Sequence, residues 1–284
     1  MQRENFALTD GRNIEFLRNS VIDNSAIILH AGTAQDISGW RTWLDYFASR
    51  GVSALAFGRS GYGGSSRKPG RVTIDVANDV AQLVSKLEIR EFVNLGLSGG
   101  GQHAIATGLK KGSKGVVTVG SLAPFESLKT TFYDGMQQAD IDEYHDALVN
   151  INLLIARFKR SFEQDPRDYV AGVNLSENDL KASASPTWEC IMKSLHYTMT
   201  QGWDWVADDY SSYLNPWGFD PRSLSVPAVI WQGGLDKNVP PQHGQWLVEN
   251  LEFAHLELRP DESHLGVFVN YEVPIMESAI NLLN

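Results

Sequence analysis

The feature that most constrains the fold of this chain is a regular alternation between short apolar runs and longer amphipathic segments. The first half contains four continuous apolar runs: SAIILHAG (25–32), VSALAF (52–57), EFVNLGL (91–97) and GVVTVGSL (115–122). Such runs are typical of strands buried on both faces. The segments between them, such as the one that starts at Thr73, carry apolar residues at helical spacing. Strands that alternate with helices predict an α/β fold, built on a mostly parallel, doubly wound sheet with helices on both faces.

Two segments of the chain depart from this alternation of strands and helices, one before the first buried strand and one in the second half. ENFALTD and NIEFLRN alternate apolar and polar residues around a DG turn, which predicts a hairpin. From about Pro124 to Asp220 the patterns are helical only, and strand–helix alternation then resumes with PAVIWQGGLD, AHLELRP and a final helix. We therefore predict a core of residues 1–123 and 221–284, with residues 124–220 inserted as a helical cap.

Composition and charge narrow the classes of partner. The formal net charge is −10 and no block of lysines or arginines occurs, which argues against nucleic acid. No apolar stretch approaches the roughly 20 residues that span a bilayer, and the start shows no secretory h-region. Cys190 is the only cysteine and the spacings CxxC and HExxH are missing, so no internal disulfide is possible and no metal site is expected. We expect a cytoplasmic protein with a small-molecule substrate and no cofactor; the sequence leaves the oligomeric state open.

A serine lies where the strand EFVNLGL gives way to a helix. The residues Gly96-Leu97-Ser98-Gly99-Gly100 match the pattern G-x-S-x-G. A tight strand-to-helix turn strains the serine backbone and crowds neighbouring segments, and glycines two positions before and after relieve that crowding. Because an apolar strand precedes the pattern and a helix follows it, we predict that the turn presents Ser98 as a nucleophile.

The same stretch contains a second pattern with a different chemistry. Gly99, Gly101 and Ala104 satisfy G-x-G-x-x-A, the relaxed form of the dinucleotide-binding fingerprint. That fingerprint normally belongs to the first βαβ unit, and a carboxylate follows it by about 20 residues, at the end of the next strand. Here several strands precede the pattern and GVVTVGSL ends without a carboxylate. The nucleophile hypothesis is therefore favoured.

A serine hydroxyl needs a base to take its proton and an acid to orient that base. Of the seven histidines, only His264 lies in a predicted loop just after the last strand, in PDESHLG. The carboxyl ends of parallel strands share one edge of the sheet, and Asp236 ends the strand AVIWQGGL at that edge. Glu126, just past GVVTVGSL, is an alternative acid. We predict His264 as the base and Asp236 as the acid.

The order Ser98, Asp236, His264, each after a strand, resembles that of the α/β-hydrolase superfamily. Three further segments are similar to family motifs: LHAGT (29–33) to the His-Gly oxyanion loop, FGRSGYGGSS (57–66) to the Gly-Tyr-Gly-x-Ser loop, and GGLDKNVP (233–240) to the segment that carries the acid. Together these motifs cover essentially the whole chain outside the insert. The resemblance implies the α/β-hydrolase fold with an inserted cap.

The resemblance also implies a serine hydrolase that forms an acyl-enzyme. The backbone N–H groups of Gly32 and Gly99 would form its oxyanion hole, and Ala31, in place of the usual glycine, leaves these backbone donors intact. We expect the substrate to be a small to medium, neutral, apolar carboxylic ester. The alternatives are amide, thioester or C–C bond hydrolysis, perhydrolase chemistry, and a receptor-like fold that binds a ligand and turns it over slowly.

The predicted cap differs in composition from the core. It holds 15 of the chain's 29 aromatic residues, and 16 acidic residues against 7 basic ones. We expect most of these aromatics to pack the cap helices together and a few to line an apolar pocket. Asp208 and Asp209 could alternatively attract a cationic substrate.

Overall fold

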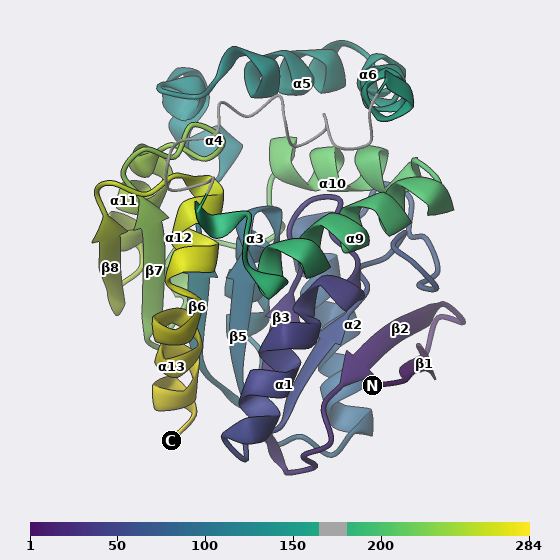
Figure 1. The fold of residues 1–284 in the computed structure, drawn as a ribbon, viewed down its shortest axis with the longest axis vertical. Coiled ribbons are helices and arrows are strands. Elements are labelled where there is room, and N and C mark those ends of the chain that lie inside the picture. The colour runs from purple at the N-terminus through teal and green to yellow at the C-terminus, as the bar shows by residue number, and fades with distance from the viewer. Residues whose placement is uncertain (165–180) are drawn as a thin grey trace.

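The computed structural model describes residues 1–164 and 181–284, as a central sheet with helices on both faces and further helices above one end (Figure 1). The eight strands are β1 (Arg3–Ala7), β2 (Asn13–Arg18), β3 (Ser25–His30), β4 (Ala54–Phe57), β5 (Glu91–Leu97), β6 (Ser113–Val119), β7 (Ala228–Gly233) and β8 (Ala254–Arg259). Their order in the sheet is β1-β2-β4-β3-β5-β6-β7-β8. β1 pairs with β2 and β2 with β4 in antiparallel fashion, and the other neighbours are parallel. The predicted hairpin and the mostly parallel, doubly wound sheet are confirmed.

Alternate side chains of β3 show how the two faces of the sheet are buried. Ile27 and Leu29 pack into one apolar cluster, whereas Ala26 and Ile28 pack into another on the opposite face. The first face is covered by α1 (Arg41–Ser49), α12 (His264–Asn270) and α13 (Glu272–Leu283). The second face is covered by α2 (Thr73–Lys86), α3 (Gly101–Gly108) and α11 (Pro241–Asn250). The core also contains three short 3₁₀ helices: η1 (Ile37–Trp40) before α1, η2 (Ser98–Gly100) between β5 and α3, and η4 (Pro221–Ser223) before β7.

A helical insert lies between β6 and β7, over the carboxyl ends of the parallel strands (Figure 1). Its described elements are α4 (Phe125–Leu128), η3 (Lys129–Tyr133), α5 (Gln138–Val149), α6 (Ile151–Gln164), α9 (Pro186–Gln201) and α10 (Asp204–Leu214). The predicted helical insert is thus confirmed. Its exact limits, 124–220, stay a prediction, and residues 165–180 of it lie outside the described residues.

Residues Ile141 to Phe162 of the insert carry apolar side chains at helical spacing without a visible break, but the structure divides this stretch between α5 and α6. Asn150 separates them with an extended backbone (φ −165°). Its side chain accepts a hydrogen bond from the N–H of Asn152 at 3.0 Å, as an N-cap residue does. A start signal for α6 therefore interrupts the continuous apolar periodicity.

None of the helices that the structure describes is long and apolar enough to cross a membrane. The central strands are instead buried by the surrounding helices.

Candidate active site

Ser98 occupies a strained turn between β5 and α3. Its φ of +51° lies in the left-handed region, which is unusual for a residue other than glycine. The turn brings Gly96 so close to the next helix that a Cβ at this position would lie 2.6 Å from the carbonyl oxygen of Gly100. The crowding that the sequence predicts around the serine is therefore present in the structure.

His264 and Asp236 lie next to each other at the same edge of the sheet. Nδ1 of His264 is 2.7 Å from Oδ2 of Asp236. The other oxygen of Asp236 accepts hydrogen bonds from the backbone N–H groups of Asn238 (2.9 Å) and Val239 (2.8 Å). Gly120, with φ +53°, permits this approach, because a Cβ there would lie 2.9 Å from the imidazole. Asp236 is buried, with its side chain 0% exposed, so the orientation of the carboxylate is fixed from within the fold.

The expectation that His264 lies in a loop needs correction, because it is the first residue of α12. Ser263 is the N-cap of that helix, and its hydroxyl accepts a hydrogen bond from the N–H of Gly266 at 3.0 Å. The cap fixes the backbone directly before the histidine. His264 is therefore anchored by a helix start rather than carried on a free loop.

The alternative acid and the other core histidines lie elsewhere. Glu126 is in α4 and lines a separate pocket together with Trp217. His30, His103 and His243 are fully buried. Burial lowers the pKa of His30 to about 3 and that of His243 to about 4. These histidines are neutral parts of the core.

A cavity of about 290 Å³ opens between the core and the insert. Its core side is lined by Gly32, Thr33, Gln35, Leu97, Ser98, Asn238, His264 and Leu265. Its insert side is lined by Gln137, Ala139, Asp140, Glu143, Arg157, Phe158, Ser161, Ile191 and Leu195. The structure thus brings the predicted nucleophile and base to one cavity, whose wall is partly apolar and partly charged. Across residues 1–164 and 181–284, no group of three or more His, Cys, Asp or Glu side chains is arranged to hold a metal ion.

The two predicted oxyanion donors flank the serine. A Cβ at Gly32 would lie 3.6 Å from Cβ of Ser98, which shows how closely the two segments approach. The N–H of Gly32 donates to Oε1 of Gln35 at 3.0 Å. Gly99 follows the serine directly, and a side chain there would collide with Tyr213. An oxyanion at the Gly32 donor would have to replace the amide oxygen of Gln35.

Two carboxyl groups on α5 face the cavity. Asp140 accepts hydrogen bonds from Asn238 (2.8 Å) and Gln137 (3.0 Å), and burial raises its pKa to about 6. Glu143 accepts a hydrogen bond from the hydroxyl of Tyr210. Burial, and then the neighbouring charge of Asp140, raise the pKa of Glu143 to about 8. Near neutral pH this wall holds groups that release or take up a proton.

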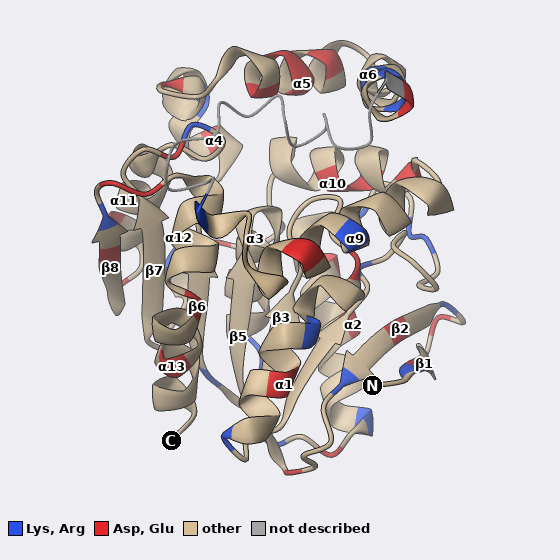
Figure 2. Cartoon of the chain, in the orientation of Figure 1, with Lys and Arg blue, Asp and Glu red and all other residues tan. Residues whose placement is uncertain are grey.

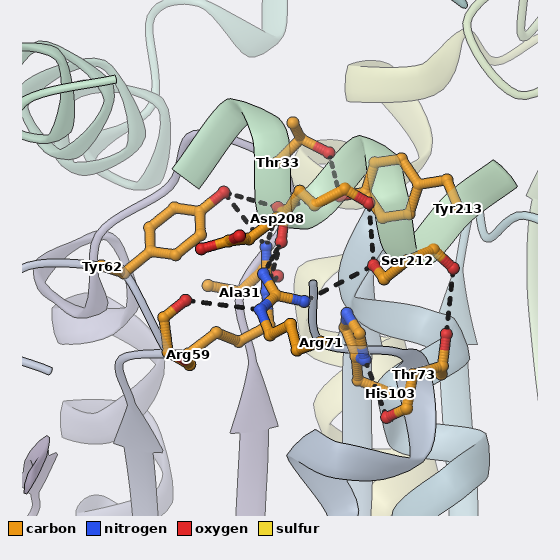
Figure 3. Close-up of polar contacts among 12 residues, drawn as sticks. Ala31, Thr33, Arg59, Tyr62, Arg71, Thr73, His103, Asp208, Ser212 and Tyr213 are labelled. Carbon is orange, nitrogen blue, oxygen red and sulfur yellow. Dashed lines mark hydrogen bonds and ion pairs between the residues drawn. The ribbon is translucent and has the colours of Figure 1, made fainter. Parts of the chain in front are cut away.

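Asp208 and Asp209 are not open to a substrate, which corrects the expectation that they could attract a cation. Both are buried. Asp208 pairs with Arg67 at 2.8 Å, and Asp209 pairs with Arg59 at 2.6 Å and also with Arg71. Figure 3 shows Arg59, Arg71 and Tyr62 close together under α10. Burial by itself would raise the pKa of Asp209, but the two guanidinium groups lower it well below its ordinary value. These carboxylates join the insert to the core.

Several side chains of the site carry no signal that sequence reasoning could use. Asp140 and Glu143 look like solvated charges of an amphipathic helix, and Gln35 is one polar residue of a loop. Arg59 lies within FGRSGYGGSS, but the sequence does not show that its partner is Asp209. Only the folded chain shows these relations.

Comparison with known proteins supports the fold. The family model described as alpha/beta hydrolase fold matches residues 25–271. A non-heme haloperoxidase of Rhodococcus erythropolis is 25% identical over 257 residues, which cover 86% of this chain and 87% of that protein. A non-heme chloroperoxidase of Streptomyces lividans is 28% identical over 145 residues, which cover 49% of this chain and only 52% of that protein.

Solved structures agree over the full length. The thermophilic esterase from Thermogutta terrifontis superposes with a TM-score of 0.71 at 19% identity, and the match covers 100% of both chains. The enol-lactonase from Burkholderia xenovorans LB400 gives a TM-score of 0.70 at 17% identity, covering 99% of each chain. At these identities the likeness shows the fold alone. Together with the family match over most of the chain, it shows that the protein belongs to the alpha/beta hydrolase fold family.

Proposed function

We propose that the protein is a serine hydrolase that cleaves carboxylic esters through an acyl-enzyme on Ser98. The observation that supports this most is the arrangement at one cavity. Ser98 lies on a strained turn, and His264 on the same wall has its Nδ1 2.7 Å from a buried carboxylate of Asp236. Nucleophile, base and orienting acid are the three roles that acyl transfer by a serine requires.

In the proposed reaction, Nε2 of His264 takes the proton of Ser98 as Oγ attacks the acyl carbonyl. Asp236 accepts Nδ1–H, which leaves Nε2 as the basic nitrogen. The N–H groups of Gly32 and Gly99 stabilise the oxyanion, and for Gly32 the substrate displaces Gln35. The imidazolium then protonates the leaving alcohol, and a water molecule releases the acid by the reverse steps.

The cavity supports a small to medium substrate with an apolar body. Its volume of about 290 Å³ lies near the lower end of the range of roughly 300–1,000 Å³ for ligand pockets. Apolar side chains from both the core and the insert line it, among them Leu97, Phe158 and Leu195. We therefore propose neutral, apolar esters as the first substrates.

Fluorophosphonate labelling followed by mass spectrometry tests the proposal. We expect an adduct on Ser98 that is lost in His264→Ala, and ester turnover that is lost in Ser98→Ala while the melting temperature is kept. Hydrogen peroxide should be included as a competing acyl acceptor, because one relative is named a non-heme chloroperoxidase and another a non-heme haloperoxidase. A folded protein without an adduct on Ser98 would contradict the proposal. Tight ligand binding with one slow turnover would favour the receptor-like alternative.

A second candidate is hydrolysis of esters or amides that carry an amine. The carboxyl groups of Asp140 and Glu143 on the cavity wall favour it, since an ammonium group placed there would stabilise their ionised forms. Amine-bearing substrates should then be preferred over neutral isosteres, and Asp140→Asn should remove that preference by raising KM for the amine alone. Equal KM values for the two substrates in the wild-type protein would exclude this candidate.

A further inference from the structure

Arg59 binds the carbonyl side of the loop that carries Gly32. One terminal nitrogen donates to the carbonyl oxygen of Ala31 and the other to that of Gly32 at 3.2 Å. The Ala31 carbonyl belongs to the same peptide group as the Gly32 N–H, and in a trans peptide these two groups point in opposite directions. The guanidinium therefore lies behind the proposed oxyanion donor, whose N–H is directed at the cavity-lining Gln35. A cation on the carbonyl also polarises the peptide and strengthens its N–H as a donor.

The next two residues of the loop are held by tyrosine hydroxyls. Oγ1 of Thr33 lies 2.7 Å from the hydroxyl of Tyr213. The N–H of Ala34 donates to the hydroxyl of Tyr62 at 3.1 Å. With Arg59, these contacts hold the loop at four successive residues, 31 to 34. Figure 3 labels two of them, Ala31 and Thr33, beside Arg59 and Tyr213.

All three of these side chains meet at one carboxylate, that of Asp209 on α10. Arg59 donates to it at 2.6 Å, Tyr62 at 2.5 Å and Tyr213 at 2.9 Å. Asp209 is fully buried, and a second guanidinium, that of Arg71, also pairs with it. Two guanidinium charges against one carboxylate leave the cluster with a positive excess, which favours an anion at the loop.

We infer that Asp209, a residue of the insert, is a positioning residue for the oxyanion hole: through Arg59 it orients and polarises the peptide that presents the Gly32 N–H. This inference rests on the proposed function. It makes the insert part of the apparatus that stabilises the transition state, in addition to its role as a wall of the cavity.

Arg71 supplies a matched control. It is as buried as Arg59 and pairs with the same carboxylate. Its other hydrogen bonds go to the carbonyl oxygen of Ser60 (3.3 Å) and to Oγ of Ser212 (3.5 Å), away from loop 31–34. Arg71→Gln thus removes one buried guanidinium from Asp209 without removing a contact to the loop.

The experiment compares Arg59→Gln, Arg59→Lys and Arg71→Gln in the full chain. It measures kcat, KM, the melting temperature and the inhibition constant of a trifluoromethyl ketone, which forms an anionic adduct with a serine nucleophile. Loss of a whole oxyanion donor costs about 10²–10³ in rate, so a misdirected donor should lower kcat by at least about ten-fold in Arg59→Gln relative to Arg71→Gln. The inhibition constant should rise by a similar factor while KM changes little, and Arg59→Lys should lie between.

Equal losses in Arg59→Gln and Arg71→Gln would overturn the inference, because the cluster would then support only the fold. If Arg59→Gln does not fold, Arg59→Lys and Arg71→Lys give the same comparison, since lysine keeps the buried charge but cannot bind two carbonyl oxygens with the fork of a guanidinium. An increased inhibition constant with a retained melting temperature supports the inference, and an unchanged one overturns it. A wild-type protein that does not react at Ser98 overturns the proposed function and the inference with it, whereas a reactive wild type with equal variants overturns the inference alone.

Discussion

The two oxygens of Asp236 have different partners, and this division explains how one buried carboxylate fixes a histidine. Oδ1 is held by two backbone N–H groups, so Oδ2 is left in a fixed direction toward His264. Asp236→Asn should keep this geometry but favour the wrong imidazole tautomer, and kcat should fall about 10⁴-fold. Steady-state kinetics on an activated ester measure this effect. Glu126→Gln is the control, and a loss of that size in the control instead would reassign the acid.

Glu143 should make stability depend on pH in a defined direction. Burial raises its pKa in the folded protein to about 8, above the ordinary 4.5, so the folded state holds the proton longer than the unfolded state does. Its contribution to stability is therefore lost as the pH rises through that window. Glu143→Gln, which retains an acceptor for Tyr210, should gain melting temperature relative to wild type as the pH is raised.

The control for this effect is Glu189, an exposed carboxylate whose pKa is lowered by its hydrogen bond and ion pair with Lys193. Glu189→Gln should show no such gain, because ionisation of this group is favoured in the folded state. A parallel pH dependence in wild type and Glu143→Gln would show that Glu143 does not hold its proton in the folded protein.

Among single residues, the sequence predicts those whose place follows from the chain itself. Ser98 and Asp236 each follow a predicted strand, and parallel strands end at one edge, so their proximity could be expected. Asp209 could not be interpreted in this way. A sequence shows its charge but not its partner, and Arg59 is 150 residues away in the chain. The expectation that Asp209 could attract a cationic substrate was wrong because this carboxylate is already paired with arginines far away in the sequence.

Among helices and strands, the start of α12 is the element that most directly positions the site. Ser263 caps this helix one residue before His264. Ser263→Ala should lower the free energy of unfolding by about 1 kcal/mol, since loss of an N-cap typically costs roughly 0.5–2 kcal/mol. Urea unfolding measures this change. Ser263→Asp retains a capping oxygen and should restore most of the loss; equal stabilities of the alanine and aspartate variants would contradict the capping role.

The sequence predicts the presence of a helix or strand better than the residues at which it begins and ends. Apolar runs and helical periodicity depend on which face of an element is buried, and this information is local. The break between α5 and α6 and the start of α12 depend instead on single capping side chains, Asn150 and Ser263. Both residues are favourable N-caps and were visible in the sequence, but the apolar periodicity around Asn150 continues across the break.

Over the whole molecule, the excess of acidic residues should act on association more than on chemistry. The net charge is −10, and Figure 2 shows acidic positions in red along α5, in the insert. Charges on the surface of the insert act on an approaching substrate through solvent. There the screening length falls from about 30 Å at 0.01 M salt to about 3 Å at 1 M. For a choline ester, kcat/KM should therefore fall with added salt.

The neutral isostere, a 3,3-dimethylbutyl ester, should show a nearly flat dependence on salt in the same assay. Equal salt dependences for the two esters would show that the acidic surface does not steer substrates, and that short-range contacts in the cavity govern both reactions.

Two helices of the insert have different positions: α10 is joined to the core, and α6 lines the cavity. α10 carries Asp209 and is tied to the core, whereas α6 packs against α5 and α10 and sends Arg157, Phe158 and Ser161 to the cavity. Substitutions at Arg157 or Ser161 should therefore change which molecules fit, whereas Phe158 also packs on Trp205 and Tyr210 of α10. For directed evolution of the proposed esterase toward new substrates, Arg157 and Ser161 are thus the first positions of α6 to vary.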